Sequence, residues 1–210
     1  MIRVGVTGTI GAGKSSVGRL FEAWGARRID ADALARQAVR PGSRALDRIR
    51  ATWGDGVLLP GGELDRAALR RLVFADPEAR RRLEAIVHPA IEALRVRALE
   101  EARAAGTDLV VAEIPLLYEK GLEGEFDLVI VVDAPVEERR RRVGLSRRLT
   151  PDEFDAMDAV QWTGARKRSR ADVVIWNDGD EAALERSARA AWERVERLRK
   201  GENGPTPRRG

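Results

Sequence analysis

Short, uniformly apolar runs recur along the chain and alternate with stretches whose apolar residues follow helical spacing. The runs predict five strands, at residues 3–7, 26–30, 109–114, 128–133 and 173–176. Strands that are apolar throughout are typical of a parallel sheet covered on both faces. Because helical stretches separate the strands, the pattern predicts an α/β fold with a doubly wound parallel sheet.

Two stretches show an apolar face at helical spacing and belong beside this sheet. The first follows the first strand and ends before Gly25, with its apolar face at Val17, Leu20, Phe21 and Trp24. The second follows the last strand and has its apolar face at Leu184, Ala188, Ala191, Val195 and Leu198. Both are expected to pack on the sheet.

Two helical insertions interrupt the strand pattern and suggest how the chain is divided. The first predicts a helical lobe at about residues 41–105, with breaks at Asp76-Pro77, where Asp76 caps a helix, and at His88-Pro89. The second predicts a helical lid at about residues 135–170. The core then consists of residues 1–40, 106–134 and 171–200, and residues 201–210 form a frayed tail.

Composition narrows the classes of function. The chain has no cysteine, so disulfides, thiolate zinc sites and cysteine nucleophiles are excluded. No apolar run is long enough to cross a bilayer and the N-terminus lacks an export signal, so we expect a cytoplasmic protein without a membrane partner. Only four of the 38 basic residues are lysines. The arginine excess reflects either genome composition or affinity for phosphates, and the scarcity of aromatic residues argues against nucleic acid as a partner.

The strongest chemical signal lies directly after the first strand. Residues 8–15 read GTIGAGKS and match the phosphate-loop motif G-x-x-x-x-G-K-[ST] in full, between an apolar strand and an amphipathic helix. Backbone N–H groups of such a loop surround phosphates, so we expect ATP to bind at Gly11, Ala12, Gly13, Lys14, Ser15 and Ser16. Lys14 should reach the β- and γ-phosphates as a catalytic residue, and the Ser15 hydroxyl should help hold Mg²⁺. The motif predicts a P-loop protein, and the short chain with its helical insertion favours the P-loop kinase fold.

Three further stretches restrict the class of P-loop protein. They read DADALAR at residues 30–36, VHP at 87–89 and IPLLYE at 114–119, and no N-K-x-D motif of the GTPases occurs. With the phosphate loop, their order and spacing resemble the dephospho-coenzyme A kinase family. The likeness continues through Gln161, Lys167, Asp172 and Asn177, so it covers residues 2–180.

The resemblance implies a reaction and a set of substrates. In this family ATP phosphorylates the ribose 3′-hydroxyl of dephospho-coenzyme A, which gives coenzyme A and ADP. The resemblance also implies a five-stranded parallel core, a helical lobe for the acceptor substrate and a mobile lid. Other acceptors, such as a nucleoside monophosphate, shikimate or gluconate, are the alternative among kinases. A nucleotide-binding switch or RNA-binding module is the alternative outside them.

Acidic residues at the carboxyl ends of two strands are candidates for proton and metal chemistry. Asp32 matches the aspartate on the acceptor side in the family, and we expect it to accept or orient the 3′-hydroxyl proton, or else to cap the helix that begins near Ala33. If the chain stays extended here, Asp30 and Asp32 point to the same side. Asp30 either holds a metal-bound water or caps that helix, and Glu113 is placed for a contact with such a water.

The expected acceptor site has four further candidates. His88 either contacts the substrate or bonds a backbone group at the helix break. Arg36 either binds a phosphate of the acceptor or is solvated. Pro115 and Leu116 either line the acceptor site or pack in the core.

The expected lid is rich in arginine. Arg139 to Arg142 are consecutive residues of one predicted helix, so their side chains point in different directions around its axis and cannot all face one ligand. Most of this run is expected to be solvated. Arg147, Arg148 or Lys167 is the candidate for the cation that closes on the transferred phosphoryl group. The family has an arginine where this chain has Ser146, which leaves the lid arginine open. Asn177 follows the last strand and is expected to contact the adenine of ATP.

Overall fold

A computed structural model describes residues 1–147 and 149–202, without the side chains at positions 74, 75 and 147. The strands are β1 (Ile2–Gly8), β2 (Arg27–Asp30), β3 (Leu109–Glu113), β4 (Leu128–Asp133) and β5 (Val173–Trp176). The α-helices are α1 (Lys14–Ala23), α2 (Ala31–Ala38), α3 (Arg44–Trp53), α4 (Arg66–Ala75), α5 (Pro77–Ala104), α6 (Val136–Arg147), α7 (Pro151–Ala159), α8 (Gly164–Arg168) and α9 (Glu181–Arg199). No helix among the described residues is long and apolar enough to span a membrane.

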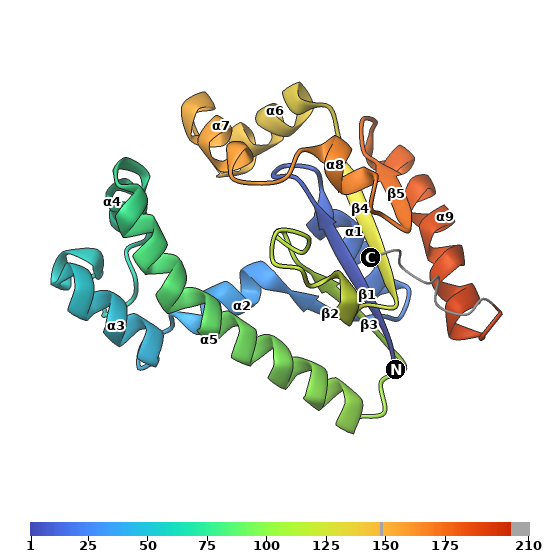
Figure 1. The fold of residues 1–210 in the computed structure, drawn as a ribbon, viewed down its shortest axis with the longest axis horizontal. Coiled ribbons are helices and arrows are strands. Elements are labelled where there is room, and N and C mark those ends of the chain that lie inside the picture. The colour runs from blue at the N-terminus through green and yellow to red at the C-terminus, as the bar shows by residue number, and fades with distance from the viewer. Residues whose placement is uncertain (148, 203–210) are drawn as a thin grey trace. The chain divides into compact units, whose positions relative to one another are not determined.

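The five strands form one parallel sheet in the order β2-β3-β1-β4-β5 (Figure 1). This confirms the predicted fold class, and each predicted strand lies within one residue of the observed one. β1 is the central strand, since it pairs with β3 on one side and with β4 on the other. The phosphate loop therefore leaves the sheet at its centre, where the carboxyl ends of open α/β sheets bind ligands.

α1 and α9 cover one face of the sheet and form the main core with it (Figure 1). Phe21 of α1 is fully buried, and its ring centroid lies 5.2 Å from that of Trp192 of α9. The apolar face predicted for the last helix is buried at all five positions, Leu184, Ala188, Ala191, Val195 and Leu198. These contacts fix α1, and with it the phosphate loop, against the sheet.

The opposite face is covered near β1 by the segment that links β3 to β4. A Cβ on Gly5 would lie 2.8 Å from Leu117 and 3.0 Å from Phe126, so these two side chains contact the strand backbone directly. Both are buried. The sheet is thus apolar on both faces, as the uniformly apolar strands predicted.

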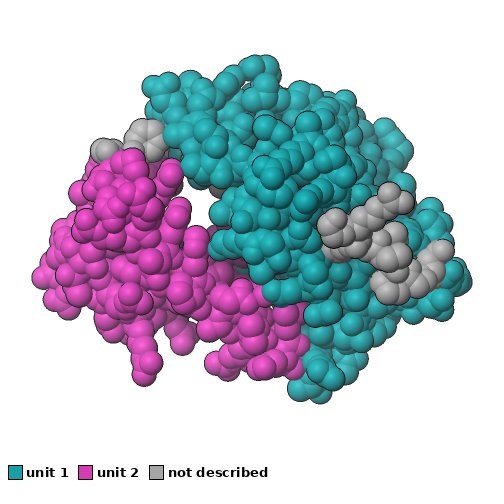
Figure 2. Space-filling view, viewed as in Figure 1, with its two compact units in different colours: residues 1–30, 102–210 teal, residues 31–101 magenta. Residues whose placement is uncertain are grey.

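The chain divides into two compact units, which Figure 2 shows in teal and magenta. The first comprises residues 1–30 and 102–210 and contains the sheet. The second, Ala31–Glu101, contains α2, α3, α4 and most of α5, whereas the lobe expected from the sequence began at residue 41. It has a small apolar core of its own, in which Ile49 is fully buried and Val57, Leu69 and Ile86 nearly so. Of the expected tail, residues 203–210 lie outside the described residues.

The predicted break at His88-Pro89 is wrong, because α5 runs through Pro89 without interruption. A proline inside a helix removes one hydrogen bond and normally disfavours the helix. Here the apolar residues on both sides of Pro89, Ile86 and Ile91 among them, pack into the core of the second unit, and this packing holds the helix together. The other predicted boundary is confirmed, since Asp76 accepts a hydrogen bond from the N–H of Glu78 at the start of α5.

Candidate active site

The phosphate loop joins β1 to α1. Gly13 occupies the position before α1 with φ 100°, a left-handed conformation that favours glycine, and no side chain caps the helix there. The first turn of α1 has no acidic residue. Its N-terminal N–H groups and the positive end of the helix dipole are therefore available to an anion.

Lys14 lies across this loop. Its ammonium donates hydrogen bonds to the carbonyl oxygens of Gly8 and Thr9, at 3.1 and 2.9 Å. Thr9 in turn donates from its hydroxyl to Asp133 at 3.2 Å. The backbone of the loop itself thus holds the ammonium, and the half-buried Ser15 follows it in the first turn of α1.

Two of the expected carboxylates meet on neighbouring strands. Asp30 and Glu113 are paired in the register of β2 and β3, and Arg28 donates to both carboxylates, to Asp30 at 2.9 Å. Glu113 is only 6% exposed. Burial raises the pKa of Glu113, and the hydrogen bond and charge of Arg28 oppose that rise. Arg28 was not anticipated from the sequence, although its place two residues before Asp30 on one strand was a usable signal.

Asp32 is placed differently from the expectation for an extended segment. α2 begins at Ala31, directly after β2, so the chain is not extended here. The side chains of Asp30 and Asp32 are therefore not placed on one side by strand alternation. Asp32 lies in the first turn of α2, and Asp30 is the residue before the helix. Asp32 and Arg36 both belong to the second unit.

Asp133, at the end of β4, is a site residue that the sequence analysis missed. It is almost fully buried, accepts from Thr9 of the phosphate loop, and forms an ion pair with Arg168 of α8. The available signal was its position, because β4 neighbours β1 and ends at the same edge of the sheet.

The arginine run on α6 is less solvated than expected. Arg139 is 7% exposed and pairs with Asp158 of α7 at 2.6 Å, and Arg142 donates to Asn177 at 3.1 Å. Arg140 and Arg141 pair with glutamates of their own helix. The prediction that most of the run is solvated is therefore wrong for two of the four, since residues three apart on a helix share a face. Of the expected lid cations, Arg148 and the side chain of Arg147 lie outside the described part of the chain.

Lys167 is buried rather than placed as a mobile lid cation. Its side chain is fully shielded, and its ammonium lies 2.9 Å from the carboxylate of Glu119 and 2.8 Å from the carbonyl oxygen of Pro115. Burial lowers the pKa of Lys167, and Glu119 opposes that change. Pro115 and Leu116 are half-buried, and the hydroxyl of Thr7 also donates to Pro115, at 3.3 Å.

Asn177 contacts the phosphate loop itself. It is 5% exposed, and its side-chain N–H donates to the carbonyl oxygen of Ala12 at 2.8 Å. Asn177 also lines a cavity of about 530 Å³ together with Ser16 and Leu20 of α1, and most of the lining residues are charged.

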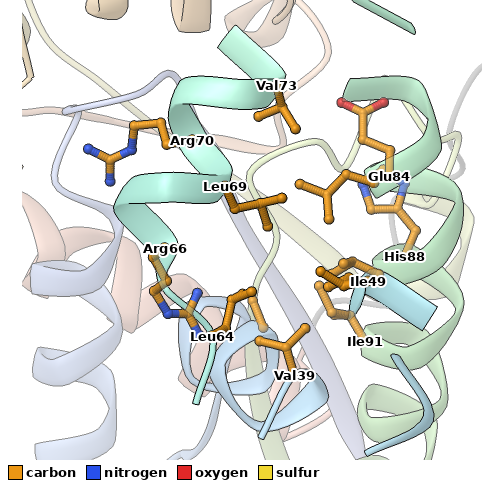
Figure 3. Close-up of a pocket in the computed structure, with 13 residues that line it drawn as sticks. Val39, Ile49, Leu64, Arg66, Leu69, Arg70, Val73, Glu84, His88 and Ile91 are labelled. Atoms are coloured by element: carbon orange, nitrogen blue, oxygen red, sulfur yellow. The ribbon is translucent and has the colours of Figure 1, made fainter. Parts of the chain in front are cut away.

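The second unit has a cavity of its own, of about 360 Å³ (Figure 3). Its wall is mostly apolar, with Leu69 of α4 and Ile91 of α5 among the lining residues. Arg66 and Arg70 of α4 add two cations, and His88 of α5 lies in the wall opposite α4. The structure thus brings His88 to a cavity, which Asp32 and Arg36 do not line.

The parallel sheet in the order β2-β3-β1-β4-β5, with a complete phosphate loop on its central strand, defines a P-loop kinase. A sequence model of the dephospho-CoA kinase family matches residues 2–183. The chain belongs to the dephospho-CoA kinase family, which confirms the resemblance, and it uses ATP to phosphorylate dephospho-coenzyme A.

Individual relatives agree with this assignment. The chain is 44% identical to the dephospho-CoA kinase of Thermobifida fusca over 197 residues, which cover 94% of this chain and 98% of that one. It is 48% identical to the dephospho-CoA kinase of Anaeromyxobacter dehalogenans over 181 residues, 86% of each chain. The alternative acceptors considered from the sequence are not favoured.

Solved structures share this fold, and one of them is a dephospho-CoA kinase. The dephospho-CoA kinase from Campylobacter jejuni superposes with a TM-score of 0.68 at 25% identity, over 96% of this chain and 98% of that one. The structure of TT1252 from Thermus thermophilus has a TM-score of 0.74 at 41% identity, over 92% and 97% of the two chains. A shikimate kinase from Acinetobacter baumannii, at 17% identity and a TM-score of 0.51, shares the fold alone.

Proposed function

We propose a division of roles among the residues of this chain in phosphorylating dephospho-coenzyme A. The phosphate loop binds the triphosphate of ATP, and the ribose 3′-oxygen of the acceptor attacks the γ-phosphorus. A bond forms between that oxygen and phosphorus, the bond to the oxygen of ADP breaks, and the hydroxyl proton passes to a base. The position of the Lys14 ammonium over the loop, held by Gly8 and Thr9, is the observation that carries this proposal.

Lys14 is the catalytic cation in this scheme. When a triphosphate enters the loop, its oxygens replace the carbonyl oxygens of Gly8 and Thr9 as the partners of the ammonium. Negative charge on the transferred group and on the leaving ADP is then neutralised by a group already in place. Because the transition state of phosphoryl transfer is loose, this placement is the main contribution that the chain makes.

Mg²⁺ is the metal that these residues fit. The candidate donors are the Ser15 hydroxyl and the carboxylates of Asp30 and Glu113, all of them oxygen atoms, which Mg²⁺ prefers. Both carboxylates already accept from Arg28, so they suit contacts through water rather than direct ligation. No group of three or more metal-binding side chains occurs in the described chain, which suits an ion held mainly by phosphates and water. When bound, Mg²⁺ neutralises charge on the phosphate oxygens.

Asp32 is the proposed base for the acceptor hydroxyl. Its carboxylate lies in the first turn of α2, two residues after the strand that ends beside β3. A carboxylate near the attacking oxygen orients the hydroxyl and accepts its proton as the bond to phosphorus forms. Arg36, one turn later on the same helix, is proposed to bind a phosphate of the acceptor.

The cavity of the second unit is proposed to hold the acceptor's pantetheine arm. Its apolar wall suits a flexible, largely uncharged chain, and Arg66 and Arg70 suit the phosphates that precede that chain. His88 of α5 lines the same cavity and is proposed as a contact to the arm (Figure 3). The half-buried Pro115 and Leu116 are proposed as further acceptor contacts, in a segment that Lys167 holds in place.

A coupled assay with purified protein, ATP and Mg²⁺ tests the proposal. We expect ADP formation with dephospho-coenzyme A and little with AMP, shikimate or gluconate. Omitting Mg²⁺ should abolish the rate. Equal rates with AMP would contradict the acceptor assignment, and full activity in excess chelator would contradict the metal.

A further inference from the structure

The arginine-rich helix α6 has an inner face that contacts the phosphate loop. Arg139 and Arg142 lie three residues apart, which places them on one side of the helix. Arg139 donates a hydrogen bond to the carbonyl oxygen of Ile10 at 3.3 Å, and Arg142 donates to Asn177, which itself contacts the loop. The outer arginines Arg140 and Arg141 pair with Glu137 and Glu138, and Arg142 also pairs with Glu138, at 2.8 Å.

Arg139 is held rigidly where it meets the loop. Its guanidinium makes two hydrogen bonds to the carboxylate of Asp158, at 2.6 and 3.2 Å, and a third to the carbonyl oxygen of Ala134 at 3.2 Å. Ile10 is 4% exposed and packs in a small cluster with Val143, Leu149 and Phe154. A planar group fixed at several donors loses little further freedom when it holds a carbonyl oxygen.

Asn177 holds the loop at a second carbonyl. Its side-chain N–H donates to the carbonyl oxygen of Ala12 at 2.8 Å. Arg142 donates to the side-chain oxygen of Asn177 at 3.3 Å and to its backbone oxygen at 3.1 Å. Because Arg142 can only donate, the amide must turn its N–H toward Ala12.

The two contacts with carbonyl oxygens also fix the direction of the neighbouring N–H groups of the loop, because a peptide group is planar. The described peptide bonds are all trans, and in a trans peptide the C=O of one residue points opposite to the N–H of the next. A fixed Ile10 carbonyl therefore fixes the Gly11 N–H, and a fixed Ala12 carbonyl fixes the Gly13 N–H. No hydrogen bond among the described residues uses either of these glycine N–H groups.

We propose that Arg139 and Asn177 are positioning residues which aim the N–H groups of Gly11 and Gly13 at the phosphates of ATP. Neither residue touches the nucleotide phosphates in this scheme, since each acts through the opposite end of a peptide group. The inference rests on the proposed binding of ATP by the phosphate loop.

The close approach of the two glycines to these contacts agrees with the proposal. A Cβ on Gly11 would lie 2.6 Å from the backbone oxygen of Arg139, and a Cβ on Gly13 would collide with the side-chain nitrogen of Asn177. Both glycines also have left-handed φ values, of 76° and 100°. Any larger residue would push the loop away from the groups that orient it.

Inorganic tripolyphosphate with Mg²⁺ is the probe, because it occupies the loop without an adenine. Its affinity is measured by calorimetry, and the amide shifts of Gly11 and Gly13 are followed by NMR on ¹⁵N-glycine-labelled protein. Arg139→Met should weaken binding about tenfold, since one hydrogen bond to a charged group is misdirected. It should also reduce the ligand-induced shift at Gly11 more than at Gly13. Asn177→Ala should show the reverse pattern.

Arg140→Met is the matched control, because it removes a neighbouring arginine of α6 that pairs with Glu137 and Asp155. It should bind tripolyphosphate like the wild type. If Arg139→Met does not fold, Asp158→Asn loosens the same guanidinium and should give the same pattern at Gly11 with a smaller loss.

Three outcomes overturn the inference. Wild-type affinity and shifts in both variants would show that the contacts do not orient the loop. Weaker ATP binding by Asn177→Ala with unchanged tripolyphosphate binding would make Asn177 an adenine contact. If the wild type does not bind tripolyphosphate, the proposed role of the phosphate loop is overturned together with this inference. The first two outcomes overturn the inference alone.

Discussion

Gly18 of α1 lies directly against the carboxylate of Glu113, with no room between them for a methyl group. A Cβ at position 18 would collide with a carboxylate oxygen of Glu113 and lie 2.9 Å from the guanidinium nitrogen of Arg28. The helix that begins in the phosphate loop is thereby packed against the paired carboxylates of β2 and β3. A side chain at position 18 would disturb both at once.

Gly18→Ala is therefore expected to destabilise the protein, although alanine favours helices. Overpacking at a buried site costs about 1–3 kcal/mol of the free energy of unfolding. Urea unfolding of the variant and the wild type measures the difference. Gly144→Ala on α6 is the control, because among the described residues a Cβ there meets only the backbone oxygen of Leu149, at 4.0 Å. Equal stability of Gly18→Ala and wild type would contradict the close packing.

Lys14→Ala should fold but turn over about 10³-fold more slowly. The substitution removes the cation that neutralises charge on the transferred phosphoryl group, and removal of one such group typically costs 10²–10³ in rate. Steady-state kinetics and a thermal melt measure both properties. Lys200→Ala, at the end of α9, removes the same charge far from the loop in sequence and should retain full activity.

Asp32→Asn should lower kcat by about 10²–10⁴-fold while ATP affinity stays within a factor of two, because a general base acts on the acceptor hydroxyl. Kinetics with both substrates varied and calorimetry with an unreactive ATP analogue separate the effects. Asp47→Asn, an exposed acid on α3, is the control. An unchanged kcat would leave Asp32 as a residue that only stabilises the first turn of α2.

Leu69→Trp should fill the cavity of the second unit and raise the KM for dephospho-coenzyme A about tenfold, with the KM for ATP unchanged. A tenfold change corresponds to about 1.4 kcal/mol, the scale of one apolar group excluded from its site. Leu72→Trp is matched to it, since Leu72 lies on the same helix but is 44% exposed. If both variants keep the wild-type KM, the arm does not bind in this cavity.

Glu113→Gln should change how stability depends on pH. Burial raises the pKa of Glu113 above its unfolded value of 4.5, so the folded state keeps its proton to a higher pH than the unfolded chain. The contribution of this bound proton to the free energy of unfolding is fully present below pH 4.5. It is lost as the pH rises through the raised pKa of Glu113. The stability of wild type minus that of Glu113→Gln should therefore fall with rising pH in this window. Unfolding at a series of pH values measures it, and a rising difference would contradict the shift.

The sequence predicted the sheet and the phosphate loop because their signals are local. Apolar runs mark the buried strands, and the glycines and Lys14 mark the loop within eight residues. Pro89 shows the limit of such signals. The local rule that proline disfavours a helix predicts a break at this residue. Packing of α5 in the core of the second unit keeps the helix continuous.

Residues that act through distant partners could not be assigned from the sequence. Four adjacent arginines are chemically alike, and only tertiary contacts distinguish Arg139, which donates to the carbonyl oxygen of Ile10. The sequence predicts Lys167 as a candidate lid cation, but in the structure it is buried and pairs with Glu119, which lies far earlier in the chain. In both cases tertiary structure decides the role.

The central place of β1 has a consequence for synthesis on the ribosome. Its residues pair with Leu109 and the rest of β3 on one side and with β4, which ends at Asp133, on the other. β1 leaves the exit tunnel before either of its partners and must therefore stay unpaired until β3 has been translated. The second unit, Ala31–Glu101, has its own apolar core and emerges in the meantime. Pausing of translation before β3 would prolong the exposure of an apolar strand and favour aggregation of the nascent chain.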